Sequence, residues 1–422
     1  MADESKGFIR SSMILLVTST IAAAISYLFQ FGMGRLLGPA DYGILAVFFS
    51  ILYVMQAPMQ AVQLTITKFV AEFRAKSKFS LIKDFLMRSD KKIFLISLII
   101  FFIFTILNKQ IASFLNISDN LLVISFGFIF IGLFVISCVR GFLQGMQKFK
   151  ALGFNLISES VIKLIASLTF IFSGFGVAGA VWGTNISIFL AFLLAFALLF
   201  KLLKKYESQH LNNEEKSKIY SYSIPMLIAL SSITALYSLD VILVKHFFTA
   251  TDAGIYAAAS LVAKVIFFAL MPISQVMFPK IAELEMKKQK YTFIFLKSVL
   301  LVAGLSMLAI LIYFIEPKFV LNFLFGAEYI AAVPLIGIFG IAISLMSICY
   351  VFVNYFLAIG KTGFVYVLPA FPVAEVILIW FIHGSFYQVL TLITAVMASM
   401  LIVSVIFYLF SKNETVNSNP SI

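Results

Sequence analysis

Charged residues are scarce in this chain. Only 12% of its 422 residues are Asp, Glu, Lys or Arg, and 62% are hydrophobic. A soluble globular protein has about 25% charged and about 45–50% apolar residues. About 20 apolar residues suffice for a helix to cross the roughly 30 Å hydrocarbon core of a bilayer. The scarcity of charge therefore leaves no room for a large soluble domain and indicates an integral membrane protein.

Residues that hold metals or carry out catalysis are also few. The two cysteines, Cys138 and Cys349, both lie inside apolar runs, which argues against a structural disulfide or a metal site. No Asp-Asp or Asp-x-Asp pair occurs. The chain thus lacks the clustered acids with which a membrane glycosyltransferase or prenyltransferase would hold Mg²⁺ and a diphosphate. We expect no enzyme, no cofactor and no metal.

Twelve apolar runs follow one another along the chain. They are continuous rather than alternating, which predicts helices and not barrel strands. The first run is interpreted as a spanning helix and not as a cleaved signal peptide, because eleven more runs follow it. The expected spans are 11–34, 42–64, 93–113, 121–139, 152–173, 178–200, 219–244, 254–277, 292–314, 330–352, 362–382 and 388–410. The predicted fold class is an all-α integral membrane protein with twelve transmembrane helices.

Basic residues are concentrated on one side of these spans. If the two termini and every second loop face the same side, that side carries 24 of the 31 Lys and Arg, and the other side carries 4. The positive-inside rule then places both termini in the cytoplasm. The longest loop, 65–92, is expected to carry a basic helix on the inner leaflet, with specific recognition of an anionic lipid as the alternative. Because the basic residues are spread over short loops, the net charge of +12 does not indicate a nucleic-acid partner.

The two halves of the chain resemble each other at a fixed offset of 211 residues, which is half of 422. The matching residues are Asp41 and Asp252, Gly43 and Gly254, Ile44 and Ile255, and Glu72 and Glu283. An even number of spans in each half makes this a parallel repeat, with lobes expected to rock around a central cavity. The predicted lobes are 1–205 and 219–422, each with six helices, joined by a cytoplasmic linker at 206–218.

Four segments also resemble a known family in their order and spacing. They are 34–43 (GRLLGPADYG), 140–149 (RGFLQGMQKF), 174–180 (GFGVAGA), and 251–259 (TDAGIYAAA) with Leu239-Asp240 before it. These segments resemble the polysaccharide flippases of the multidrug/oligosaccharidyl-lipid/polysaccharide exporter superfamily. The matching turn in the second half, 383–386 (HGSF), departs from the Gly-x-x-Gly pattern. Some relatives also carry two further spans, so the substrate stays open.

The resemblance implies a transporter that works by alternating access. Its expected substrate is a lipid-linked oligosaccharide on an anionic polyprenyl-phosphate-type carrier, flipped to the outer leaflet for surface polysaccharide or glycan assembly. It implies a location in the plasma or inner membrane, contact with membrane lipids, and polysaccharide-assembly enzymes as candidate partners. The alternative on the same scaffold is a cation-coupled exporter of drugs or metabolites, and H⁺ or Na⁺ is the candidate coupling ion in either case.

Ionisable residues inside the expected spans are the candidate site residues, because such groups are costly in a bilayer unless they face a cavity or a partner. Glu159 and Lys163 lie four residues apart and share a helix face, so they form either a structural pair or part of a cavity wall. Arg35, at the expected outer mouth together with His246, is interpreted as an interfacial anchor more readily than as a ligand.

Three further candidates lie in the second half. Lys264 is predicted to bind the anionic head of the substrate, with a packing ion pair to Asp240 as the alternative. Counting about 1.5 Å per residue from Thr249 places these two side chains at different depths. Glu375 follows a pair of prolines, which indicates either a coupling-cation site with Asp240 or a plain helix kink.

Overall fold

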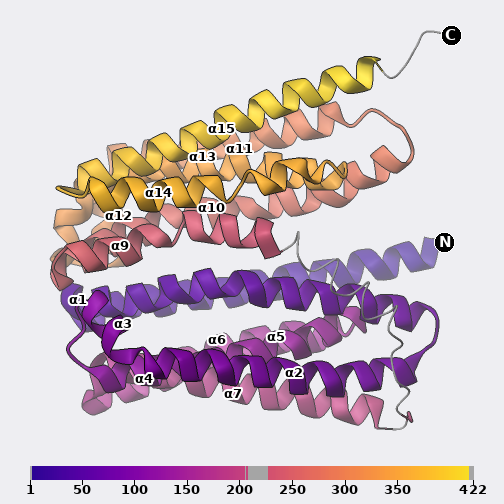
Figure 1. The fold of residues 1–422 in the computed structure, drawn as a ribbon, viewed down its shortest axis with the longest axis horizontal. Helices are drawn as coiled ribbons and strands as arrows, with labels where there is room; N and C mark the ends of the chain where they lie inside the picture. Colours follow the sequence, from indigo (N-terminus) through magenta and orange to yellow (C-terminus); the bar gives the residue numbers. More distant parts are fainter. Residues whose placement is uncertain (1, 205, 208–226, 418–422) are drawn as a thin grey trace. The chain divides into compact units, whose positions relative to one another are not determined.

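The computed structural model describes residues 2–204, 206–207 and 227–417, and every regular element in these ranges is a helix (Figure 1). The chain forms two compact units, 1–230 and 231–422, which are described separately. Most of the predicted linker 206–218, and the start of the predicted span 219–244, lie outside the described residues. The predicted lobe boundaries therefore stay a prediction.

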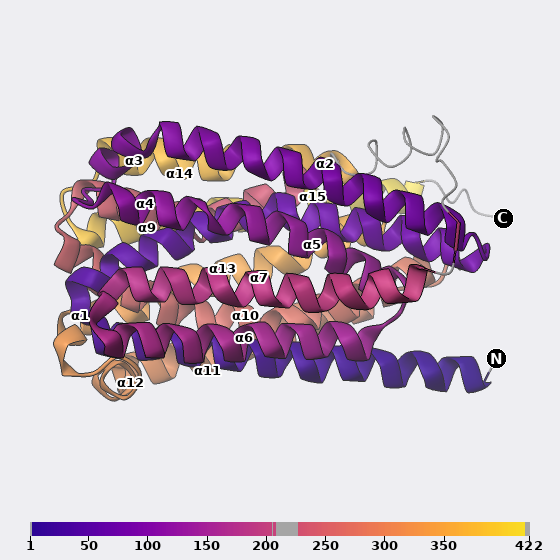
Figure 2. The same ribbon diagram turned by 90° about the horizontal axis from the view of Figure 1, so that it is seen from below.

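Unit 1 begins with a helix that doubles back on itself. Helix α1 (Ala2–Ala75) is broken at Gly38, whose φ of 72° lies in the left-handed region that glycine adopts without a steric penalty. Figure 2 shows α1 running away from the N-terminus and then returning. The remaining helices are α2 (Phe79–Ile106), α3 (Asn108–Phe114), α4 (Asn120–Gly127), α5 (Ile129–Gly145), α6 (Phe149–Phe170), the short η1 (Ile171–Phe175) and α7 (Gly176–Leu203).

Helices α6 and α7 form the second hairpin of unit 1. The chain reverses at Gly174 and Gly176, which have φ angles of 89° and 50°. The two helices lie side by side (Figures 1 and 2). A Cβ at Gly179 would lie 2.8 Å from the Cβ of Phe170. Glycines in the 174–180 segment thus explain both the reversal and the close packing that follows it.

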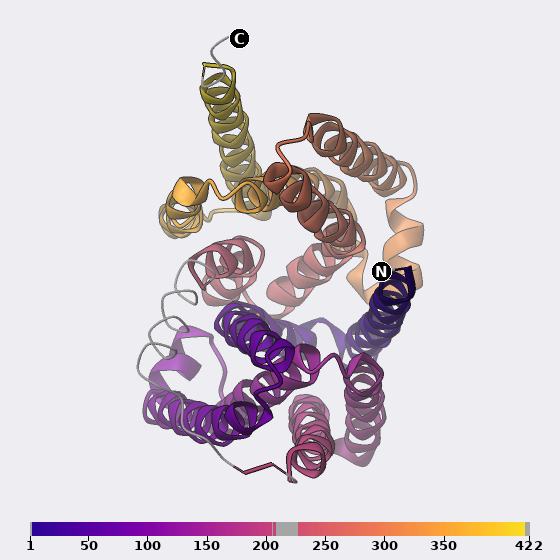
Figure 3. The same ribbon diagram turned by 90° about the vertical axis from the view of Figure 1, so that its right-hand side faces the viewer.

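A bent pair leads into unit 2, residues 227–236 followed by α9 (Leu239–Phe247), with an angle of 44° between them. The helices that follow are α10 (Ala250–Met286), α11 (Thr292–Ile315), α12 (Pro317–Leu324), η2 (Ala327–Ala332), α13 (Val333–Ala358), η3 (Thr362–Tyr366), α14 (Ala370–Phe381) and α15 (Phe386–Asn417). Helix α10 packs against α11 and α13, and α13 packs against α15. Figure 3 shows many of the helices end-on.

The described residues contain eight helices that are long and apolar enough to cross a membrane, or ten if each of two bent pairs is one span. The prediction of an all-helical, multi-pass membrane protein is therefore confirmed. Two of the eight, Val17–Ala75 and Phe149–Leu203, have 59 and 55 residues. Each is more than twice the length that a bilayer requires, and each contains a glycine with positive φ. The exact number of spans stays a prediction.

The predicted long loop at 65–92 is wrong. Helix α1 continues to Ala75 and α2 begins at Phe79, so only residues 76–78 are non-helical. An apolar run ends where the hydrocarbon ends, whereas helical hydrogen bonding continues into the polar interface. Of the basic residues of this segment, Lys76 and Lys78 lie in the turn, and the others lie on the two helices that flank it. The same reason explains Arg140, which was expected in a loop and lies within α5.

Helices α1 and α10 end in turns with similar φ angles and the same backbone hydrogen bonds, 211 residues apart. Ser77 has a φ of 55° and Lys288 has a φ of 53°. Ser77 N donates to Arg74 O at 2.9 Å, and Lys288 N donates to Glu285 O at 3.0 Å. The next residue donates to the carbonyl five positions back in both turns, at 2.8 and 2.9 Å. The same turn also ends α3 at Asn116 and α5 at Gln147, so it is a common helix end and the repeat stays a prediction.

Candidate functional site

Three helices of unit 2 bring ionisable side chains together in its interior. Asp240 comes from the first turn of α9, Lys264 from the middle of α10 and Glu375 from α14. Asp240 and Lys264 are each 3% exposed, and Glu375 is fully buried. Lys264 lies within electrostatic range of both carboxylates, although their positions along the chain suggested different depths. A Lys stem bridges such an offset, so substrate binding by Lys264 and an ion pair with Asp240 both stay predictions.

The carboxylates of this cluster retain unused hydrogen-bonding capacity. Tyr256 Oη donates to Asp240 Oδ2 at 3.1 Å. Among the described residues, Asp240 Oδ1 and both carboxylate oxygens of Glu375 have no hydrogen-bond partner. A buried carboxylate without donors is unfavourable unless it binds a proton or a cation. Two acids and one base leave a formal surplus of one negative charge, which such a ligand would neutralise.

The prolines next to Glu375 start a helix rather than kink one. Pro369 precedes the first residue of α14, and Pro372 lies in its first turn. The preceding residues form η3 and a turn, and with α14 they make up one span-length stretch, Gly363–Phe381, close to the expected span 362–382. Proline is tolerated there because the first N–H groups of a helix have no intrahelical acceptor. Glu375 itself lies inside α14 and faces the interior of unit 2.

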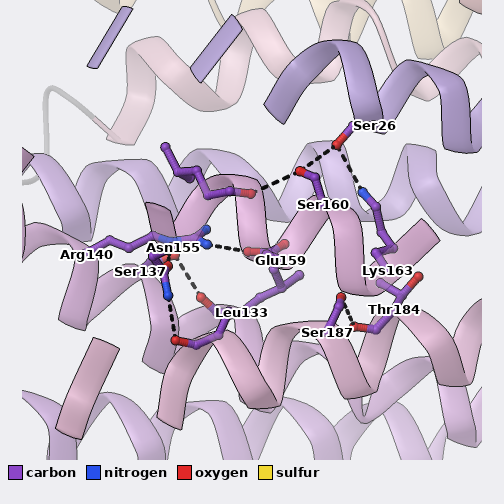
Figure 4. Close-up of polar contacts among 12 residues, drawn as sticks. Ser26, Leu133, Ser137, Arg140, Asn155, Glu159, Ser160, Lys163, Thr184 and Ser187 are labelled. Carbon is purple, nitrogen blue, oxygen red and sulfur yellow. Dashed lines mark hydrogen bonds and ion pairs between the residues drawn. The ribbon is translucent and has the colours of Figure 1, made fainter. Parts of the chain in front are cut away.

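Unit 1 holds a second polar network, built on α5, α6 and α7 (Figure 4). Arg140 of α5 forms an ion pair with Glu159 of α6, donating from Nη2 to Oε2. Its Nε donates to Asn155 Oδ1 at 2.9 Å. Asn155 Nδ2 in turn donates to the Ala191 carbonyl of α7 at 2.7 Å. The guanidinium is therefore held at two points.

Lys163 points away from this ion pair (Figure 4). Its Nζ donates to Ser26 Oγ on α1 at 3.3 Å and lies 5.1 Å from the centre of the Phe29 ring. The Ser26 and Ser160 hydroxyls are 3.3 Å apart. Glu159 forms its ion pair with an arginine on the neighbouring helix and not with Lys163, although it stays within electrostatic range of Lys163. Arg140, Lys163 and Glu159 together leave one positive charge in surplus, opposite to the cluster of unit 2.

Sequence reasoning missed Arg140 because the apolar run appeared to end one residue before it. The signal that could have identified it is the apolar stretch that continues beyond it, at Phe142 and Leu143. Both of these residues are fully buried. An arginine between two buried apolar stretches requires an internal partner.

The motif 140–149 also joins α5 to α1. A Cβ at Gly141 would lie 2.8 Å from the Gln63 carbonyl oxygen, and one at Gly145 would lie 2.7 Å from the Thr67 carbonyl oxygen. Gln63 Nε2 donates to Gln144 Oε1 at 3.0 Å across the same contact. Two glycines four residues apart let helix backbones approach closely, as in many membrane helix pairs. These glycines are explained by packing and not by a ligand.

The remaining candidate, Arg35, is exposed near the end of the first half of α1. Its counterpart His246 stacks on Trp380, with ring centres 5.6 Å apart. Neither residue belongs to the two polar networks described above. Among the described residues there is no group of three or more His, Cys, Asp or Glu that could hold a metal ion.

Comparison with solved structures shows the fold. An inward-facing multidrug resistance MATE family transporter of the MOP superfamily aligns with a TM-score of 0.78 and 12% identity, over 96% of this chain and 100% of that chain. A MOP superfamily transporter from Pyrococcus furiosus aligns with a TM-score of 0.68 and 14% identity, over 94% of both chains. At such low identity these similarities establish the fold alone.

Comparison of sequences shows the family. An uncharacterised membrane protein of Methanocaldococcus jannaschii is 26% identical over 288 residues, which are 65% of this chain and 68% of that protein. The family model described as polysaccharide biosynthesis protein matches residues 8–285, more than half of the chain. The chain therefore belongs to the polysaccharide biosynthesis protein family, and its helices are those of a multi-pass membrane protein.

Proposed function

We propose that this transporter flips a lipid-linked oligosaccharide, on an anionic polyprenyl-phosphate-type carrier, from the cytoplasmic to the outer leaflet. The product would serve surface polysaccharide or glycan assembly, with assembly enzymes as partners. Membership of the polysaccharide biosynthesis protein family supports the substrate class. The observation that carries the proposal is the surplus positive charge of unit 1, where Lys163 donates to a hydroxyl and lies beside a ring, while Glu159, the carboxylate within electrostatic range of it, is ion-paired to Arg140.

Lys163 is the candidate ligand for the phosphate of the carrier. Its ammonium is a mobile point charge with donors to spare. Ser26 and Ser160 supply two hydroxyls within the same network. Lys264, the stronger candidate from the sequence, already has two carboxylates within electrostatic range. We therefore assign Lys264 to charge balance within unit 2, and Lys163 to the substrate.

The proposal includes twelve spans in two six-helix lobes related by a parallel repeat, with both termini cytoplasmic in the cell membrane. Counting the two helices broken at Gly38 and Gly174 as two spans each would raise ten candidate spans to twelve. The residues that match at an offset of 211 support the repeat. The uneven distribution of basic residues supports the orientation. Alternating access would follow from movement of the two lobes around the substrate.

Coupling to a cation is assigned to unit 2. Asp240 and Glu375 have unpartnered carboxylate oxygens and a surplus negative charge, so H⁺ or Na⁺ would bind there favourably. The same observation favours the second candidate function, a cation-coupled exporter of drugs or metabolites. Solved structures with this fold include multidrug resistance transporters, so the scaffold is compatible with either cargo.

Transport into liposomes of defined composition separates the two functions. The protein is reconstituted, and translocation of a fluorescent polyprenyl-diphosphate-linked sugar is followed by quenching from outside. Lys163→Met should abolish translocation, whereas Lys201→Met, at the end of α7 away from the network, should leave it intact. Transport of a cationic dye that is insensitive to Lys163→Met, with no translocation of the lipid-linked sugar, would instead establish the exporter.

A further inference from the structure

Glu159 and Lys163 are spaced for an ion pair along α6, but each has its hydrogen-bond partner on another helix. On one helix, a Glu four residues before a Lys is the favoured arrangement for an ion pair. The structure turns the two side chains apart (Figure 4). Glu159 accepts from Arg140 on α5, and Lys163 donates to Ser26 on α1. Some feature of unit 1 therefore outcompetes the local pair.

Arg140 is that competitor. Its guanidinium is fixed by Asn155 as well as by Glu159, and Asn155 is anchored to the α7 backbone. The side chains of Arg140 and Glu159 are only 12% and 17% exposed, so water screens their attraction weakly. Arginine also keeps its charge in such surroundings and offers a rigid fork to a carboxylate. A lysine on a flexible stem competes poorly with it for the same oxygens.

We propose that Arg140 is a positioning residue that keeps Glu159 away from Lys163 and so leaves the Lys163 ammonium available for the anionic head of the substrate. The functional consequence rests on the substrate proposed above. Without the guanidinium, Glu159 rotates to the Lys163 one turn away and neutralises it. Lys163 is then still present but occupied by an internal carboxylate.

A binding experiment tests this with polyprenyl monophosphate as the probe and the full chain in nanodiscs. Arg140→Met should weaken binding about tenfold or more, as Lys163→Met does, because a charge-assisted hydrogen bond is lost in each. Arg140→Met combined with Glu159→Gln should return the affinity to within about twofold of wild type, since no carboxylate remains to occupy Lys163. Arg88→Met is the control, because it removes the arginine of a different arginine–carboxylate pair in unit 1, Arg88–Asp84 at 2.8 Å.

Failure to restore binding in the double variant would overturn the inference, since Arg140 would then contact the ligand or support the fold. If Arg140→Met does not fold, the double variant alone carries the test, because it leaves no unpaired acid.

A second measurement is independent of any substrate. The coupling of Glu159 to Lys163 is measured by a double-mutant cycle on unfolding, in the wild-type and Arg140→Met backgrounds. It should be close to zero in the first background and favourable in the second. If Lys163→Met binds the probe normally, the proposed function fails, and this cycle still decides the role of Arg140. A coupling of zero in both backgrounds refutes the positioning role while the proposed function stands.

Discussion

We expect the close contact between α1 and α5 to make the protein less stable when Gly145 is replaced by a larger residue. Replacing this glycine by alanine places a methyl group 2.7 Å from the Thr67 carbonyl oxygen and 2.7 Å from the Cβ of Val70. Unstrained carbon contacts lie near 3.5–4.0 Å, so the two helices must separate by about 1 Å. One of the groups that the methyl meets is a backbone carbonyl, so a rotamer change cannot relieve the clash.

The magnitude follows from two effects. Overpacking of a close contact costs about 1–3 kcal/mol. Separation also stretches the Gln63–Gln144 bond of 3.0 Å, and a typical hydrogen bond contributes about 0.5–1.5 kcal/mol. Gly304 of α11 is the matched control, because a Cβ there meets nothing within 4 Å. Gly304→Ala should be stabilising by about 0.5–1 kcal/mol, since alanine is the better helix former.

The assay is reversible unfolding of the purified protein in mixed micelles of mild detergent and dodecyl sulfate, followed by circular dichroism. Gly145→Ala should unfold at a lower dodecyl sulfate fraction than wild type, and Gly304→Ala at an equal or higher one. The two variants should differ by about 2 kcal/mol or more. Equal stability of the two would mean that α1 and α5 do not pack through Gly145, and the explanation given for the 140–149 motif would fail.

Three further predictions concern topology and the cluster of unit 2. A cysteine at Lys204 should be labelled only from the cytoplasm and one at Lys318 only from outside, and the reverse pattern would contradict the orientation inferred from the basic residues. Lys264→Met should reduce the yield of folded protein, because it leaves two buried carboxylates uncompensated. Adding Asp240→Asn should restore the yield. A normal yield of the single variant would exclude charge balance as the role of Lys264. Glu375→Gln should make translocation independent of imposed H⁺ and Na⁺ gradients without unfolding the protein. If translocation by this variant still responds to the gradients, Glu375 is not the coupling site.

Local properties of the chain were predictable because they depend on nearby residues. Continuous apolar runs are long enough to cross a bilayer, so they predicted helices and a multi-pass membrane protein, and both predictions hold. The helix ends were less accurate, as the segment 65–92 shows. Hydropathy records where the lipid ends, whereas the helix ends where the Ser77 turn satisfies its last carbonyls.

Partners of the buried charges were decided by packing between helices. Sequence spacing offered Lys163 as the partner of Glu159, since a helix brings residues four apart onto one face. Nothing local indicated that Arg140, nineteen residues earlier, would reach the same carboxylate from α5. Likewise, Asp240, Lys264 and Glu375 lie on three helices far apart in the sequence, and only the folded unit brings them within electrostatic range. The sequence by itself determined that this chain spans a membrane and that Glu159, Asp240, Lys264 and Glu375 lie inside its helices, although it missed Arg140. The tertiary structure alone decided which of those charges compensate one another, because that depends on how helices distant in the chain pack side by side.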